Sequence, residues 1–233
     1  MKVAILQCDH VLEKFRPRFG NYPEMVERMF EGTESPFSFD TYDCQKGLLP
    51  ADINEYDFYI TTGSKASVYE DADWIQQLTS FIQQLDKQKK KLIGICFGHQ
   101  LIARARNGKV EKSDKGWGIG IATNRIVSHP VWIDDKSEQI NILLSHRDQI
   151  TSLPEDTCVI AESDFCPFFI VQWGEHFLSI QGHPEWNTDY CQALIRDRKN
   201  IIAQDRFDAA INSLHIKPDN EQFVRWIISF VEH

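Results

Sequence analysis

The pattern of apolar and polar residues changes its period repeatedly along the first half of the chain. Four runs are continuously apolar or alternate between apolar and polar, as strands do: residues 2–7, 37–44, 56–63 and 91–96. Three segments instead carry apolar side chains three and four positions apart, as amphipathic helices do: residues 22–30, 73–90 and 98–106. This repeated strand-then-helix order predicts an α/β fold, in which helices cover a parallel sheet.

The second half of the chain begins with a different pattern. Short strands joined by turns are predicted for four segments: residues 116–127, 140–150, 157–163 and 168–183. Helical spacing then returns in three segments: residues 189–204, 206–215 and 220–233. Since the chain has no internal repeat, low-complexity tract or linker, we expect one α/β domain over residues 1–233. This domain should have a mainly parallel, flavodoxin-like central sheet flanked by helices, plus a smaller antiparallel strand region.

Composition and charge narrow the class of protein. The chain has 233 residues, of which 42% are hydrophobic and 25% charged, as in ordinary soluble domains. Its formal net charge of −9 argues against nucleic acid as a partner and against anionic membrane surfaces. The first apolar run is too short for a signal peptide, and no stretch approaches the roughly 18 apolar residues of a spanning helix. We therefore expect a cytoplasmic protein that binds neither nucleic acid nor membranes.

The six cysteines form no C-x-x-C pair and no recognisable zinc spacing. We therefore expect free thiols, no metal site and no cofactor. Five of the cysteines are expected to pack as small hydrophobic residues: Cys8, Cys44, Cys158, Cys166 and Cys191.

The sixth cysteine, Cys96, lies in the sequence Gly-Ile-Cys-Phe-Gly, after a predicted strand and before a predicted helix. This is the context of a nucleophile elbow, with cysteine in place of serine. Such a turn would force Cys96 into an uncommon backbone conformation and project its thiol at the ligand-binding edge of the sheet. The helix N-terminus would favour the thiolate, and the free amide of Phe97 would help to bind an oxyanion. From these residues alone, an inert thiol in a tight turn remains the alternative.

A cysteine nucleophile needs a base, and the base needs a residue that orients it. Of the eight histidines, five lie near loops or chain ends and are expected to be solvated: His10, His129, His176, His215 and His233. His99 opens a predicted helix and is expected to cap or pack. His183 stands out because it closes an apolar strand pattern in the sequence Gln-Gly-His-Pro-Glu. Glu185 follows two residues later, where it can bond the second ring nitrogen and stabilise the imidazolium.

These two motifs resemble those of the class I glutamine amidotransferases, the type with a Cys-His-Glu triad. Three further stretches share the likeness: residues 61–75, 115–120 and 143–154. The resemblance is greatest to the stand-alone group that is similar to the amidotransferase domain of GMP synthase. It implies that Cys96 attacks the side-chain amide of glutamine, that His183 acts as base and then acid, and that Glu185 orients His183.

The resemblance also implies the remaining site residues. One oxyanion donor would be the backbone amide of Phe97. The family's second donor lies in a Gly-Gly-Pro loop, where this chain has Gly63, with Ser64 in place of the second glycine and Lys65 in place of the proline. The positions that match the family's substrate contacts are Gln100, Ser145 and His146. For the last two, a plain strand end and turn remains the alternative.

Three functions remain open at this point. The chain has no motif typical of a synthetase, so it could be an amidotransferase that supplies ammonia to a separate synthetase subunit. It could instead be a stand-alone γ-glutamyl peptidase or hydrolase, or a non-catalytic regulatory protein with the same fold. The intact Cys96, His183 and Glu185 argue against the third function. We expect an enzyme that releases ammonia from glutamine through a cysteinyl thioester, with glutamine or a γ-glutamyl compound as its small-molecule partner.

Overall fold

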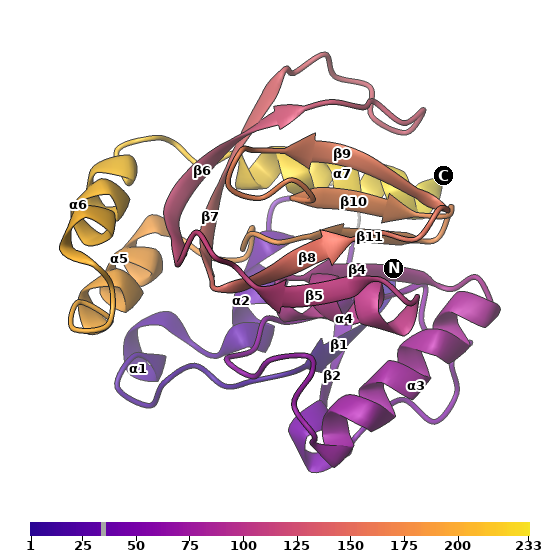
Figure 1. Cartoon of the computed structure of the whole chain (residues 1–233). Helices are drawn as coiled ribbons and strands as arrows, with labels where there is room; N and C mark the ends of the chain where they lie inside the picture. The colour runs from indigo at the N-terminus through magenta and orange to yellow at the C-terminus, as the bar shows by residue number, and fades with distance from the viewer. Residues whose placement is uncertain (34–35) are drawn as a thin grey trace.

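A computed structural model describes residues 1–33 and 36–233, which form a central sheet between layers of helices (Figure 1). The strands of the central sheet are β1 (Lys2–Gln7), β2 (Ser38–Asp43), β3 (Phe58–Thr61), β4 (Lys91–Ile95), β6 (Gly118–Ile126), β7 (Gln139–His146), β9 (Thr157–Glu162), β10 (Ile170–Trp173) and β11 (Phe177–Ile180). A second, two-stranded sheet pairs β5 (Lys109–Lys112) with β8 (Asp148–Ser152). The helices are α1 (Arg16–Phe19), α2 (Tyr22–Met29), α3 (Asp73–Lys87), α4 (Phe97–Ala105), α5 (Thr188–Asp197), α6 (Gln204–Ser213) and α7 (Asn220–Glu232), with a 3-10 turn at Cys44–Lys46.

Five strands form the parallel part of the central sheet, in the order β2-β1-β3-β4-β11. Strands β1, β3 and β4 are buried on both faces, which explains why their sequences are continuous apolar runs. Because these strands are parallel, their carboxyl ends meet at one edge of the sheet. Strands β4 and β11 are neighbours there, with Ile95 opposite Ile180. The segments that follow these two strands, which contain Cys96 and His183, therefore begin side by side.

The antiparallel strands extend the same sheet beyond β11, in the order β10-β9-β6-β7. The predicted fold class is confirmed, and the antiparallel region continues the central sheet. The strand predicted over residues 140–150 is broken at Arg147, because β7 pairs with β6 whereas β8 pairs with β5. The helix predicted over residues 189–204 ends at Asp197, because residues 196–200 carry no apolar side chain that could continue its buried face.

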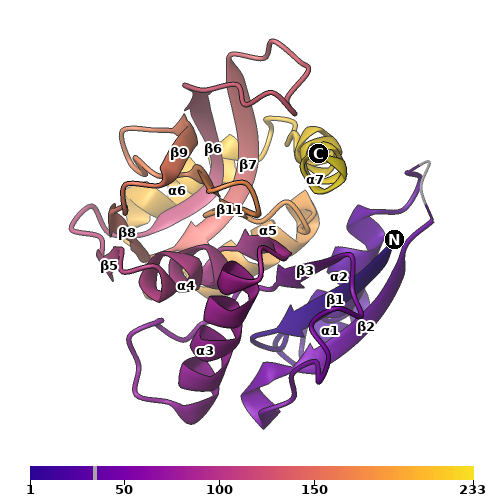
Figure 2. The same ribbon diagram turned by 90° about the vertical axis from the view of Figure 1, so that its right-hand side faces the viewer.

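Helices cover both faces of the parallel strands (Figure 2). Alternate side chains of a strand point to opposite faces, so Val3 and Ile5 of β1 pack with α2 and α7. Ala4 and Leu6 pack with α3 and α4 on the other face. Helices α5 and α6 lie against the antiparallel strands β6 and β7. No helix in the described part of the chain is long and apolar enough to span a bilayer.

Candidate active site

Cys96 occupies the sharp turn between β4 and α4, with φ of +50° and ψ of −95°. Positive φ is uncommon for a residue with a side chain, so the backbone conformation expected of a nucleophile elbow is present. The flanking glycines are required: a Cβ at Gly98 would lie 1.6 Å from Thr61 Oγ1, and one at Gly94 would lie 3.0 Å from the carbonyl carbon of Gly98. The Cys96 amide donates to the Ile180 carbonyl at 2.8 Å, which ties the turn to β11.

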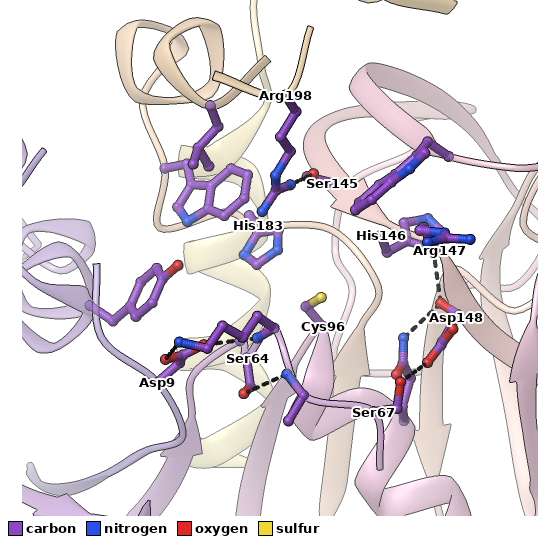
Figure 3. Close-up of a pocket in the computed structure, with 18 of the residues that line it drawn as sticks. Asp9, Ser64, Ser67, Cys96, Ser145, His146, Arg147, Asp148, His183 and Arg198 are labelled. Carbon is purple, nitrogen blue, oxygen red and sulfur yellow. Dashed lines mark hydrogen bonds and ion pairs between the residues drawn. The ribbon is translucent and has the colours of Figure 1, made fainter. Parts of the chain in front are cut away.

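His183 lies three residues beyond the end of β11, beside the Cys96 thiol (Figure 3). Its Nδ1 is 2.7 Å from Glu185 Oε1, and these two side chains are only 4% and 0% exposed. Since Nδ1 is bonded to the carboxylate, Nε2 is the ring nitrogen available to the thiol. The Gln181 side-chain amide donates to Cys96 Sγ at 3.6 Å. The structure thus brings together the three residues that the sequence predicts to act as a triad.

Electrostatics favour a protonated His183. Burial on its own lowers the pKa of this imidazole, but the charges of Glu185 and Cys96 and hydrogen bonds to both outweigh burial and raise the pKa to about 9. The imidazole therefore carries a positive charge at neutral pH. A cation next to Cys96 favours the thiolate, which is the nucleophilic form of cysteine.

The loop after β3 approaches the triad closely. A Cβ at Gly63 would lie 2.7 Å from His183 Cε1 and 3.6 Å from Cys96 Cβ. Glycine is required at this position because any side chain would displace the imidazole. The absence of a side chain brings the backbone of residues 63 and 64 within reach of a carbonyl attacked by Cys96.

The backbone amides near the thiol differ in their availability. The Lys65 amide donates to Oδ2 of the buried Asp9 at 2.9 Å, so this hydrogen is already used. This bond leaves the amides of Gly63 and Ser64 as candidates for the second oxyanion donor. The Phe97 amide begins α4, where backbone N–H groups have no partner within the helix. An oxyanion between these two backbone segments would be stabilised from both sides.

The residues expected to bind substrate line the same cavity, which has a volume of about 420 Å³. The side-chain amide of Gln100 donates to the Asp148 carbonyl at 2.8 Å and to Gln181 Oε1 at 3.0 Å. The two residues from the end of β7, Ser145 and His146, line its other wall. Within residues 1–33 and 36–233, no group of three or more His, Cys, Asp or Glu side chains is arranged to hold a metal ion.

Comparison with known proteins identifies the family. The family model for glutamine amidotransferase class I matches residues 41–198. The chain belongs to this family. It is 34% identical over 206 residues to γ-glutamyl peptidase 2 of Arabidopsis thaliana, covering 86% of this chain and 82% of that protein. Over 106 residues it is 34% identical to a glutamine-hydrolysing GMP synthase subunit of Archaeoglobus fulgidus, covering 45% of this chain and 56% of that subunit.

Solved structures share the fold of this class I amidotransferase chain. The crystal structure of a glutamine amidotransferase from Thermotoga maritima matches with a TM-score of 0.75 at 19% sequence identity. The match covers 99% of this chain and 96% of that one. The match therefore includes the helices after Trp186, which are α5, α6 and α7.

The other buried histidines of this amidotransferase-family chain differ from His183. Burial is the main cause that lowers the pKa of His99 to about 3 and that of His146 to about 4, so both are neutral at pH 7. The expectation that His176 is solvated was wrong. This residue is 3% exposed, and its Nε2 lies 2.6 Å from Asp86 Oδ1, because the turn between β10 and β11 folds onto the end of α3.

Several residues that line or support the site were not identified from the sequence: Asp9, Trp117, Arg147, Gln181, Trp186 and Arg198. Asp9 and Gln181 follow buried strands at the ligand-binding edge, so a search for polar residues directly after apolar runs would have found them. Arg198 begins the segment after α5, and only the tertiary fold brings it to the Ser145 hydroxyl, to which its guanidinium donates.

Proposed function

We propose that this protein is a cysteine-dependent hydrolase that cleaves the amide bond at the γ-carboxyl group of a glutamyl residue. The observation that supports this function most directly is the positive-φ Cys96 next to a buried, protonated His183 that is bonded to Glu185. An inert thiol in a turn would need none of these features. The buried ion pair in particular has no packing purpose that apolar side chains could not serve.

In the first half of the proposed reaction, the Cys96 thiolate attacks the γ-carbonyl carbon of the substrate. The carbonyl oxygen gains negative charge, which the amides of Phe97 and of Gly63 or Ser64 stabilise. The His183 imidazolium then gives its proton to the leaving nitrogen as the carbon–nitrogen bond breaks. The products are a free amine, or ammonia from glutamine, and a γ-glutamyl thioester on Cys96.

In the second half, neutral His183 takes a proton from a water molecule that attacks the thioester carbon. The carbon–sulfur bond breaks, glutamate leaves, and Cys96 and His183 return to the thiolate and imidazolium forms. Glu185 holds the ring in one orientation throughout and stabilises its positive charge. The remote amino and carboxylate groups of the glutamyl unit position the carbonyl, and Gln100, Ser145 and His146 are our candidates for that contact.

Two leaving groups fit this chemistry. The name of the Arabidopsis relative supports γ-glutamyl peptides as substrates, because the likeness to it extends over most of both chains. A cavity of about 420 Å³ lies within the range of pockets that hold ligands larger than a single amino acid. The second candidate is glutamine hydrolysis that supplies ammonia to a separate synthetase subunit, which the likeness to the GMP synthase subunit favours.

Hydrolysis of four compounds tests the proposal, followed as release of glutamate or, for asparagine, of aspartate: glutamine, γ-glutamylalanine, α-glutamylalanine and asparagine. We expect cleavage of γ-glutamylalanine, glutamine or both, and none of the other two, because an α-linked or shortened carbonyl would be misplaced by about an ångström or more. Cys96→Ala should abolish release, whereas the matched variant Cys158→Ala, at a half-buried cysteine outside the cavity, should not. Equal cleavage of the α- and γ-linked peptides would contradict the proposal.

A further inference from the structure

The active-site cavity carries more positive charge than the rest of the chain. The whole chain has 34 acidic and 25 basic residues, but the cavity is lined by more basic than acidic side chains. The basic side chains are Lys65, Lys112, Arg147 and Arg198, and the acidic ones are Asp9 and Asp148. A local excess of positive charge on an acidic protein attracts anionic ligands.

Three of these four basic side chains form no ion pair with a carboxylate among the described residues: Lys112, Arg147 and Arg198. Lys65 Nζ lies 3.5 Å from Asp9 Oδ1 and forms an ion pair with it. By contrast, neither Arg147 nor Arg198 forms an ion pair with any residue that the structure describes. Arg198 is half-buried, and its guanidinium donates to the neutral hydroxyl of Ser145. A partly desolvated guanidinium without a counter-charge favours an anion in the adjoining cavity.

The two guanidinium groups are held on one aromatic ring. The Arg147 and Arg198 guanidinium carbons lie 5.4 and 5.2 Å from the centre of the Trp117 ring. The three residues come from separate segments: the loop between β5 and β6, the turn between β7 and β8, and the end of α5. Stacking on the indole reduces the freedom of both arginines, so less entropy is lost when they bind a planar carboxylate.

The position of this cluster relative to the triad indicates which part of a substrate it would meet. A general acid must stand beside the nitrogen that it protonates, so the leaving group lies on the His183 side of Cys96. Figure 3 shows Arg198 on that side, next to His183, and Arg147 across from His183, beside Asp148. Arg198 is therefore the member of the cluster that lies on the leaving-group side.

We propose that Trp117, Arg147 and Arg198 form a subsite for a carboxylate on the leaving group. The substrate class would then be γ-glutamyl amino acids and peptides, whose leaving amine carries a free carboxylate. This inference rests on the proposed γ-glutamyl hydrolysis and adds a preference that glutamine, with its uncharged leaving group, cannot satisfy. Charge-assisted bonds from guanidinium to carboxylate favour the carboxylated substrate by about 10- to 100-fold.

Cleavage of γ-glutamylglycine and γ-glutamylglycinamide tests the subsite, because these compounds differ only in the terminal carboxylate. The wild-type kcat/KM should be about 10- to 100-fold higher for γ-glutamylglycine. Arg198→Gln and Arg147→Gln should each lower this ratio several-fold, and the double variant should bring it close to one. Arg198→Lys should restore part of the ratio, since it returns the charge without the planar fork. Arg225→Gln, at an exposed arginine of α7 outside the cavity, is the matched control.

Three outcomes would overturn the subsite. A wild-type kcat/KM ratio near one for the two compounds would show that the enzyme does not recognise the carboxylate of the leaving group. An equal loss for both substrates in Arg198→Gln would assign Arg198 to the glutamyl unit that they share. If neither compound is cleaved, the proposed function fails, and binding of both to Cys96→Ala, measured by isothermal titration calorimetry, becomes the test of the subsite. Equal affinity, or no binding of either compound, would then reject the subsite.

Discussion

The imidazole of His183 lies flat against the indole of Trp186, with ring centroids 3.6 Å apart and planes within 7° of parallel. Trp186 is 4% exposed, so the stack is shielded from water. An aromatic face attracts a cation, and the attraction strengthens when both groups are desolvated. Trp186 therefore acts with Glu185 to hold the imidazolium, one from the face of the ring and the other from its edge.

Replacing Trp186 should lower the pKa of His183. Stacking and cation–π contacts contribute about 0.5–2 kcal/mol, and one pKa unit corresponds to about 1.4 kcal/mol. Trp186→Leu should therefore lower the pKa from about 9 by roughly one unit, and Trp186→Phe by less. NMR titration of the imidazole nitrogens measures this shift. Trp132→Leu, at an equally buried tryptophan outside the cavity, should leave the pKa unchanged.

Cys96 should react with alkylating reagents before the other cysteines. It lines the cavity next to a cation, whereas burial raises the pKa of Cys166 and of Cys191 to about 12. A limiting dose of iodoacetamide at pH 7, followed by peptide mass mapping, should modify Cys96 first. Cys158 is half-buried and is the internal competitor. Faster labelling of Cys158 would contradict a reactive thiolate at Cys96.

Glu185→Gln should reduce activity less than removal of the nucleophile or the base. A glutamine can keep a hydrogen bond to Nδ1, but it removes the negative charge that raises the pKa of His183. Cys96→Ala and His183→Ala should each lower kcat by about 10³-fold or more, and the double variant should be no worse than either. An unchanged kcat in Glu185→Gln would show that Glu185 does not orient His183. An unchanged kcat in His183→Ala would reject the whole triad.

The raised pKa of His183 also predicts how stability depends on pH. An unfolded histidine titrates near pH 6.5, whereas the folded one titrates near 9. The stabilisation from the protonated ring is thus fully present below about pH 6.5 and is lost as pH rises through about 9. Between these two pH values, the free energy of unfolding measured with urea should depend less on pH in His183→Asn than in the wild type. His99→Asn, at a buried neutral histidine, should keep the wild-type slope.

Gly63→Ala should impair catalysis through a steric effect on the base. The added Cβ would lie 2.7 Å from His183 Cε1, and the ring cannot retreat because Trp186 lies against its face. A displacement of about an ångström at a reacting group can cost on the order of 10²-fold in rate. Circular dichroism should show a folded protein, and the loss should appear in kcat. Unchanged kcat would show that the loop after β3 moves aside.

Local patterns in the sequence predicted most of the fold and the three residues that the structure brings together at the candidate site. The apolar runs of β1, β3 and β4 and the helical spacing of α3 and α7 are each contained in one segment, so they could be identified without tertiary information. The proximity of Cys96 and His183 could be predicted because Cys96 directly follows β4 and His183 lies three residues after β11, its neighbour in the sheet. Contacts such as Arg198 with Trp117 join segments about 80 residues apart, and no local periodicity encodes them.

The central sheet is parallel at one end and antiparallel at the other, and the two halves supply different parts of the site. In the proposed reaction, residues after β3, β4 and β11 act as the nucleophile, the base and the oxyanion donors, while β7 and the segments around β5 and β8 form the wall that carries Arg147 and Trp117. The residues proposed to carry out the reaction and those proposed to select the leaving group therefore come from different halves of the central sheet. If the proposed subsite is correct, we expect exchange of the β5–β6 loop between related chains to change the preferred leaving group while the turn at Cys96 keeps its conformation.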